Sequence, residues 1–383
     1  MKNFRKKLSL LSLLLVFVIA VTACSNNGGN KPTSEIKETD KTKVTEETQK
    51  TDSSYSFKFA EKGKVIDSIG REVQLPEKIT KIAVAGNPAQ MMMFTIAPEM
   101  LVGWGSEPSE SLKKYLPDDL VNLPVIGTFY GKNASMNYEE MIKAEPDVII
   151  DVGEVKESMK EDLDGLQEQT NIPVIFVECM LENTADAYRT LGKLLDKEEG
   201  TNEQAEYIEK TLEDVKEKRE TIKDKITVYY GRGDSGLQTN SEGSIHAEVI
   251  NFIGAENVYK DDSKSSPSWE EVSMEQIAVW NPNIIMFLND SIYDTVGNDP
   301  VWKDLQAIKD NKYYEAPGEP YDWLGSPPNA NRIIGIKWLG NLVYPDIYKY
   351  DMVKETKEFY KLFYHSDLTD EQVKELLAKS TFK

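Results

Sequence analysis

Two segments of this 383-residue chain, 136 residues apart, follow the same pattern. Each begins with a polar residue, Asn137 or Ser273, which suits the N-cap of a helix. An acid then lies in the expected first turn, Glu139 or Glu275, where the helix dipole favours negative charge. A proline closes each short helix before a run of apolar residues. This repeat predicts two related lobes that each contain a helix followed by a buried strand.

Short apolar runs alternate with amphipathic stretches along the chain from about residue 79. This alternation is typical of α/β structure, in which buried strands are separated by helices. The expected strands are residues 79–85, 148–152 and 174–177 in the first half and 226–230, 284–288 and 313–316 in the second.

The N-terminus has the order of an export signal. Basic residues at positions 2–7 precede an apolar run, 8–21, which is too short for a convincing membrane span. Small residues lead to Cys24 and resemble the lipobox of bacterial lipoproteins, so we expect a signal peptide over residues 1–23 and a lipid on Cys24. The alternative is an ordinary secretory signal followed by a free thiol. Residues 24–54 are too polar to bury a core and are expected to form a tether.

Charge and cysteine content exclude several functions. The formal net charge is −20, and it becomes more negative when the basic signal residues are removed, which argues against nucleic-acid binding. With Cys24 lipidated, Cys179 has no partner for an intramolecular disulfide. The chain has only two histidines, so it lacks the ligand cluster that bare zinc or manganese requires. We expect no resident cofactor.

A charged amphipathic stretch lies between the halves. We predict a connecting helix over residues 201–223, which at about 1.5 Å per residue would span roughly 30 Å, the width of a small domain. The lobes are then residues 55–200 and 224–383. The alternative is an ordinary surface helix packed on one lobe.

Together these features resemble the class III solute-binding proteins of ABC importers, the iron-siderophore and cobalamin type. Local likenesses are a hairpin at residues 67–73, a strand at 81–85 and a turn at 254–258. The resemblance implies two Rossmann-like α/β lobes joined by one long backbone helix, with the ligand cleft between them. It also implies that Glu139 and Glu275 dock the permease, one in each lobe. As an alternative, both are simply helix-start acids.

Ligand contacts are expected in loops at the carboxyl ends of the strands, where open α/β sheets bind ligands. Aromatic side chains beside an arginine suit a planar or aromatic anionic ligand. In siderophore binders of this type a histidine can complete iron coordination, which makes His246 a candidate metal contact through a chelate; the alternative is an ordinary helix-start histidine. Arg332 and Trp338 face either the cleft or the lobe interior. The candidate contacts are Asn87, Phe129, Tyr130, Arg232, His246, Trp269, Tyr321 and Trp323.

A metal already wrapped in a chelator needs few protein ligands, so we predict a binder of a metal chelate, first of all a ferric siderophore. A cobamide or haem is the alternative, although the methionines at 91–93 suit core packing better than haem ligation. Expected partners are an ABC permease with its ATPase subunits and, through the lipid, the outer face of the cytoplasmic membrane. We expect a monomer.

Two enzyme classes compete with this interpretation. His246 with Asp234 and Glu242 fits a chelatase-like site. The glycines at 231, 233 and 236 match a dinucleotide fingerprint, but no helical pattern follows at once, as that fold requires. We therefore expect no enzyme activity.

Overall fold

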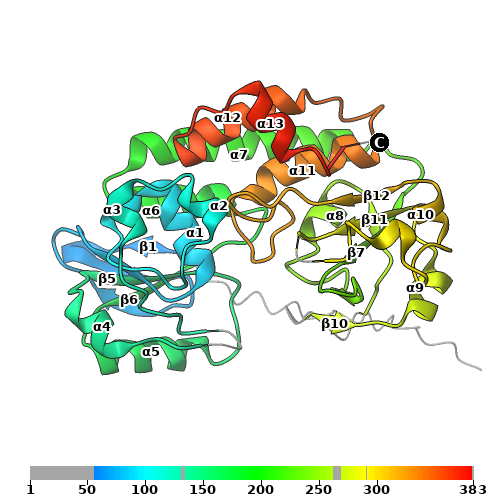
Figure 1. Ribbon diagram of the computed structural model, residues 1–383. Helices are drawn as coiled ribbons and strands as arrows, with labels where there is room; N and C mark the ends of the chain where they lie inside the picture. Colours follow the sequence, from blue (N-terminus) through cyan, green and yellow to red (C-terminus); the bar gives the residue numbers. More distant parts are fainter. Residues whose placement is uncertain (1–55, 131–133, 262–268, 290, 382–383) are drawn as a thin grey trace, which may run out of the picture. The chain divides into compact units, whose positions relative to one another are not determined.

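The computed structural model describes residues 56–130, 134–261, 269–289 and 291–381 (Figure 1). Asp52–Lys383 form one compact unit. The predicted signal peptide, Cys24 and all of the tether lie outside the described residues. No helix in the part of the chain that the structure describes is long and apolar enough to cross a membrane.

The first lobe contains a parallel three-stranded sheet in the order β4-β5-β6. The predicted strands 79–85, 148–152 and 174–177 are confirmed, with ends shifted by at most a few residues. The elements are β4 (Ile82–Val84), α1 (Asn87–Ile96), α2 (Glu110–Lys113), α3 (Asp118–Val121), α4 (Tyr138–Lys143), β5 (Val148–Gly153), α5 (Met159–Thr170), β6 (Val174–Glu178) and α6 (Thr184–Leu194).

A small antiparallel sheet precedes this lobe and contains the predicted hairpin. Its buried Arg71 donates to Asp67 Oδ2 at 3.1 Å, to the Val174 carbonyl at 2.7 Å and to Asp164 Oδ1 at 2.7 Å. Because Val174 begins β6, this arginine fixes the hairpin to the edge of the main sheet. The strands are β1 (Lys58–Phe59), β2 (Lys64–Ile66) and β3 (Glu72–Gln74).

The second lobe contains a parallel four-stranded sheet in the order β12-β11-β7-β9 and a separate antiparallel pair, β10-β8. The predicted strands 226–230, 284–288 and 313–316 are confirmed to within one residue at each end. The elements are β7 (Thr227–Gly231), β8 (Gln238–Thr239), α8 (Glu248–Phe252), β9 (Glu256–Asn257), β10 (Glu270–Glu271), α9 (Met274–Trp280), β11 (Ile284–Phe287), α10 (Gln306–Lys309) and β12 (Tyr313–Glu315).

Successive residues of each strand enter different cores, as alternating strand geometry requires. Ile82 and Val84 join the largest core, whereas Ala83 faces a smaller core on the other side of the first sheet. In the second sheet Ile284 joins the same largest core and Ile285 a third one. The largest core therefore touches one face of both sheets, and the two lobes share it.

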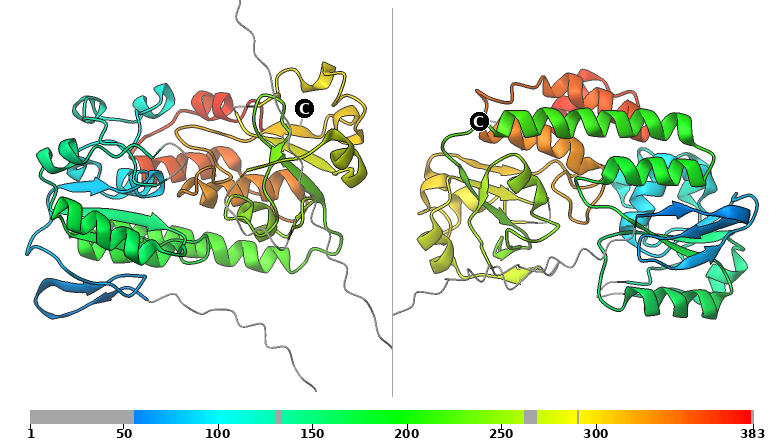
Figure 2. Two further views of the ribbon diagram at one scale, coloured as in Figure 1. Left: turned by 90° about the horizontal axis from the view of Figure 1, so that it is seen from below. Right: turned by 180° about the vertical axis from the view of Figure 1, so that it is seen from behind.

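Helices α7 (Glu198–Arg219), α11 (Asn331–Val343), α12 (Met352–Tyr364) and α13 (Asp370–Leu376) complete the unit. The long green helix in Figure 2 is α7, which passes along both lobes and begins three residues before the predicted connecting helix. The predicted boundary at 224–383 assigned the whole C-terminal part to the second lobe. In the structure, part of it packs on the first lobe. Tyr364 of α12 packs on Phe94 of α1, with ring centroids 5.7 Å apart, so the chain returns to the first lobe.

The predicted repeat is present as two equivalent units. Asn137 caps α4 by accepting from the Glu140 amide, and Ser273 caps α9 by accepting from the Gln276 amide. Helix α4 leads into β5 and α9 leads into β11. The α/β class with two lobes of this kind is thus confirmed.

Candidate functional site

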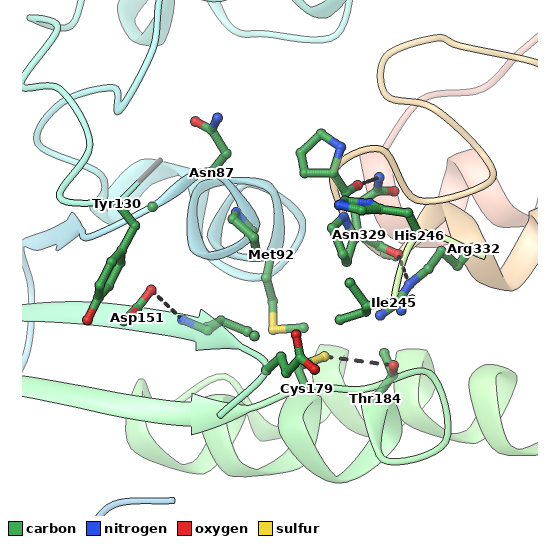
Figure 3. Close-up of a pocket in the computed structure, with 18 of the residues that line it drawn as sticks. Asn87, Met92, Tyr130, Asp151, Cys179, Thr184, Ile245, His246, Asn329 and Arg332 are labelled. Carbon is green, nitrogen blue, oxygen red and sulfur yellow. Dashed lines mark hydrogen bonds between the residues drawn. The ribbon is translucent and has the colours of Figure 1, made fainter. Parts of the chain in front are cut away.

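A cavity of about 290 Å³ lies where the carboxyl ends of β4 and β5 face segments of the second lobe (Figure 3). The first lobe contributes the start of α1, Tyr130 and the loop after β5. The second lobe contributes Ile245, His246 and the turn that leads into α11. Because its walls come from both lobes, the cavity has the position that the sheet topology predicts for a ligand.

The first wall is the N-terminus of α1. Gly86 is its N-cap in extended conformation, and Pro88 in the first turn suits the helix start. The residues Gly86, Asn87 and Pro88 line the cavity, and no acid of α1 itself occupies the first turn. The amides at this end of α1 therefore favour negative charge beside the cavity.

Asp151 places a carboxyl group there, from the end of β5. Its side chain is buried, and Oδ1 accepts from the Val152 amide at 3.0 Å. A Cβ built on Gly86 would lie only 3.7 Å from this oxygen, so the carboxyl group sits against the start of α1. Burial raises the pKa of Asp151 to about 7, against the opposing effects of the Val152 amide and Lys156. A carboxyl group that titrates near neutrality inside a cavity is typical of a functional site.

Tyr130 lies at the same end of the cavity as Asp151 (Figure 3). Burial raises the pKa of its phenol, and the nearby Asp151 raises it further. The Lys156 ammonium lies 5.5 Å from the centre of the Tyr130 ring. Phe129 packs edge-on against Tyr130 at 4.8 Å and contacts the core beneath the sheet, so it supports Tyr130 and does not line the cavity.

The opposite wall carries His246. Its Nδ1 lies 2.7 Å from the Gly325 carbonyl oxygen, which can only accept. In a neutral imidazole the proton therefore sits on Nδ1, and Nε2 carries the lone pair that a metal ion would use. Trp269 stacks on His246 at 5.7 Å with the rings 27° apart, and the Arg232 guanidinium lies 5.0 Å from the centre of the Trp269 ring.

Asn329 and Arg332 close the cavity at the start of α11. Asn329 donates to the Pro327 carbonyl at 2.7 Å and accepts from the Asn331 amide at 2.7 Å, which shapes the turn. Arg332 is buried and forms an ion pair with Glu248 of α8. Its charge is thus largely compensated inside the protein, although its side chain lines the cavity.

Sulfur atoms lie in the middle of the cavity. Met92 projects between the two walls (Figure 3), whereas Met93 is fully buried in the largest core. Cys179 is a free buried cysteine whose Sγ lies 3.8 Å from Thr184 Oγ1, and burial raises the pKa of its thiol. Within the described residues no three His, Cys, Asp or Glu side chains are grouped to hold a metal ion.

Comparison with known proteins agrees with this geometry. Residues 100–320, more than half of the chain, match the family described as periplasmic binding protein. The chain belongs to this family. A solved structure, the ABC transporter solute binding protein from Sulfurospirillum deleyianum, is similar with a TM-score of 0.77 and 30% identity over 82% of this chain and 99% of that one.

Two further relatives have lower sequence identity. The molybdate-binding protein MolA of Haemophilus influenzae is 23% identical over 82% of this chain and 94% of its own. The Fe(3+)-citrate-binding protein YfmC of Bacillus subtilis is 26% identical over 62% of this chain and 75% of its own. These relatives are named for what they bind and not for a reaction.

The sequence-predicted contacts fall into three groups. Asn87, Tyr130 and His246 line the cavity. Phe129 packs on Tyr130, and Trp269 with Arg232 stacks behind His246. The last two do not line the cavity. Tyr321 packs against the largest core, and Trp323 is fully buried within it, with its ring centroid 6.3 Å from that of Trp338 and 6.5 Å from that of Tyr360.

The predicted docking acids are both exposed. Helix α4 buries Met141 on the outer face of the first sheet, and α9 buries Ile277 on the corresponding face of the second. In each lobe the helix therefore lies on the side of the sheet away from the shared core. The pKa of Glu275 is lowered by its own backbone amide and the Ser273 hydroxyl, so this carboxylate is charged at neutral pH.

The dinucleotide fingerprint does not form. After β7, Arg232 bridges back to Gln238 and the chain continues into β8, where a nucleotide-binding fold would open a helix. Gly233 and Gly236 have φ of +77° and +71°, so they serve this tight turn.

Sequence reasoning missed Asp151, the buried acid of the cavity. The signal was present, because Asp151 is the one charged residue in the apolar run 148–152 and stands at the carboxyl end of a parallel strand. A charge in such a run is costly unless it meets a partner or a ligand.

Proposed function

We propose that this chain is the extracytoplasmic solute-binding component of an ABC importer, anchored by a lipid on Cys24, and that it captures a metal chelate for the permease. The main support is the cavity between the lobes, in which the Gly325 carbonyl orients His246 so that Nε2 is its metal-binding atom. One histidine is too few for a bare metal ion but enough to complete the coordination of a chelate.

The size of the cavity narrows the ligand class. Ligand pockets commonly range from about 300 to 1,000 Å³, and this one, at about 290 Å³, is at the small end. We therefore favour a compact ferric chelate of the size of ferric citrate. A larger ferric siderophore, cobamide or haem would require the lobes to separate. The ferric-citrate binder among the relatives is consistent with this choice.

Intrinsic tryptophan fluorescence of the purified protein tests the ligand class. The titrants are Fe(III)–citrate, ferric hydroxamate and catecholate siderophores, cobalamin, haem, molybdate and free metal ions. We expect saturable quenching by a ferric chelate, lost in His246→Ala and retained in His365→Ala, which changes the other histidine. A response to free metal ions alone would overturn the chelate proposal. A response to molybdate alone would also overturn it and would indicate that the ligand is an oxyanion.

We further propose that Glu139 and Glu275 meet one arginine on each permease subunit. Carboxylate–arginine pairs of this kind orient two proteins and speed their encounter. Reversing both charges to lysine should abolish uptake into cells without weakening ligand binding. The matched control reverses Glu217 and Asp346, two exposed acids on other segments, and should leave uptake intact. Normal uptake by the Glu139/Glu275 double variant would refute the docking role.

A further inference from the structure

Two buried polar atoms at one end of the cavity have no hydrogen-bond partner among the described residues. They are Asp151 Oδ2 and the Tyr130 hydroxyl oxygen. Asp151 is only 3% exposed, and both residues line the cavity at the same end (Figure 3). Buried polar atoms are nearly always paired, so atoms left unpaired beside a cavity indicate where a ligand completes the structure.

Only one of the two Asp151 carboxylate oxygens accepts a hydrogen bond from the described residues. Oδ1 accepts from the Val152 amide and lies against the start of α1, near Gly86. The carboxyl group thus occupies the position where α1 favours a negative charge. An oxyanion that used the same helix end would have to displace Asp151 or, when this carboxyl group is ionised, lie against a like charge.

The surrounding charges also disfavour an anion at this end. Glu154 lines the same cavity, and burial raises the pKa of its carboxyl group. The side chain of Lys156 is the cation at this end, and its ammonium lies over the Tyr130 ring. An ionised carboxylate can only accept hydrogen bonds, whereas a phenol can donate or accept. When Asp151 is ionised, the ligand that satisfies both atoms therefore brings a donor to it.

We propose that Asp151 and Tyr130 form a subsite that receives an N–H or O–H group of the ligand, such as an amino group, a hydroxyl or a metal-bound water, and that excludes fully deprotonated oxyanions. This assignment rests on the proposed function, in which His246 contacts the metal from the opposite wall. Figure 3 shows Met92 between the two ends, so a ligand that reaches both must span the cavity.

The proposal fixes the direction of proton exchange on binding. Because burial raises the pKa of Asp151 to about 7, the free protein holds this proton part of the time at neutral pH. A ligand that donates to Asp151 selects the ionised carboxylate and releases the proton. A ligand that only accepts selects the protonated form and takes a proton up. Titration calorimetry in two buffers of different ionisation enthalpy shows whether ligand binding releases a proton or takes one up.

The probes are Fe(III)–citrate prepared with one citrate per iron, which leaves positions on the iron for bound water, and molybdate, which has only acceptor oxygens at pH 7. We expect Fe(III)–citrate to bind with proton release, with affinity reduced about tenfold or more in Asp151→Ala and less strongly in Tyr130→Phe. Asp151→Asn should abolish the proton release. Glu157→Ala, an exposed acid in the same loop, is the control and should change neither quantity.

Molybdate binding with proton uptake would overturn the subsite while leaving a solute-binding role intact. Unchanged Fe(III)–citrate affinity in Asp151→Ala would overturn it as well. If neither probe binds, the proposed ligand class is refuted. The subsite is then tested by the thermal stability of the ligand-free protein. Asp151→Asn should then unfold at the same or a higher temperature than the wild type at pH 8, because no internal bond is lost. A lower melting temperature would show that Oδ2 is bonded within the protein and would refute the subsite.

Discussion

The buried carboxyl group of Asp151 should make the ligand-free protein less stable as the pH rises. Its pKa is raised from 3.8 to about 7 in the folded state. Between these values the folded protein holds a proton that the unfolded chain has lost, so the free energy of unfolding decreases with pH. A difference of about three units corresponds to roughly 4 kcal/mol in total, and about 2.5 kcal/mol of this falls between pH 5 and pH 8.

Asp151→Asn removes this titration and keeps the shape of the side chain. The variant should match the wild type closely near pH 5 and exceed it by about 2.5 kcal/mol more at pH 8. Urea unfolding followed by circular dichroism at pH 5, 6, 7 and 8, without ligand, measures the difference. A difference that is constant over this range, or that grows toward low pH, would refute our account of Asp151.

Asp147→Asn is the matched control. Burial acts to raise the pKa of Asp147, but hydrogen bonds from the Thr80 and Lys81 amides and the Thr80 hydroxyl outweigh it and lower the pKa below 3.8. Its stabilising effect is therefore fully present above pH 4 and lost only in more acid solution. The stability difference of this variant should be flat from pH 5 to pH 8.

Three further outcomes are expected. Trp269→Phe should remove most of the ligand-dependent fluorescence change, since Trp269 stacks on His246, whereas Trp323→Phe should preserve it; the reverse result would place the ligand elsewhere. Lys337→Ala should lower the free energy of unfolding by about 3 kcal/mol, measured in urea, because it leaves Glu355 partly buried without its partner at 2.5 Å. X-ray scattering should show little contraction on ligand binding, because one core joins the lobes; a large decrease in radius of gyration would contradict this.

Local patterns in the sequence were sufficient for the strands and the repeated units. Apolar runs such as 284–288 are bounded by turn residues, and the caps at Asn137 and Ser273 act within three residues. The same local signals could not separate Trp269 from Trp323, because both lie in polar, proline-containing loops. Which of them stacks on His246 depends on long-range packing, which no short pattern encodes.

Long-range pairing explains the other differences. The sequence left open whether Arg332 faces the cleft or the lobe interior. Its charge is largely compensated by an ion pair with Glu248, 84 residues away, which no local pattern predicts. The return of α12 to the first lobe was missed because it depends on a contact between residues far apart in sequence, Phe94 and Tyr364. The carboxyl ends of the strands were nevertheless a sound guide, since Asn87, Tyr130 and His246 line one cavity.

The return of α12 also bears on how the protein is produced. Phe94 of α1 contacts Tyr364, and Gln204 of α7 donates to the Thr95 and Leu362 carbonyls, so residues from both ends of the folded unit close one core. Contacts between such distant residues form slowly, since a long loop must close first. If the chain is exported from its N-terminus, as proposed here, the first lobe remains open until nearly the last residue has crossed. Export would thus be complete before stable folding begins.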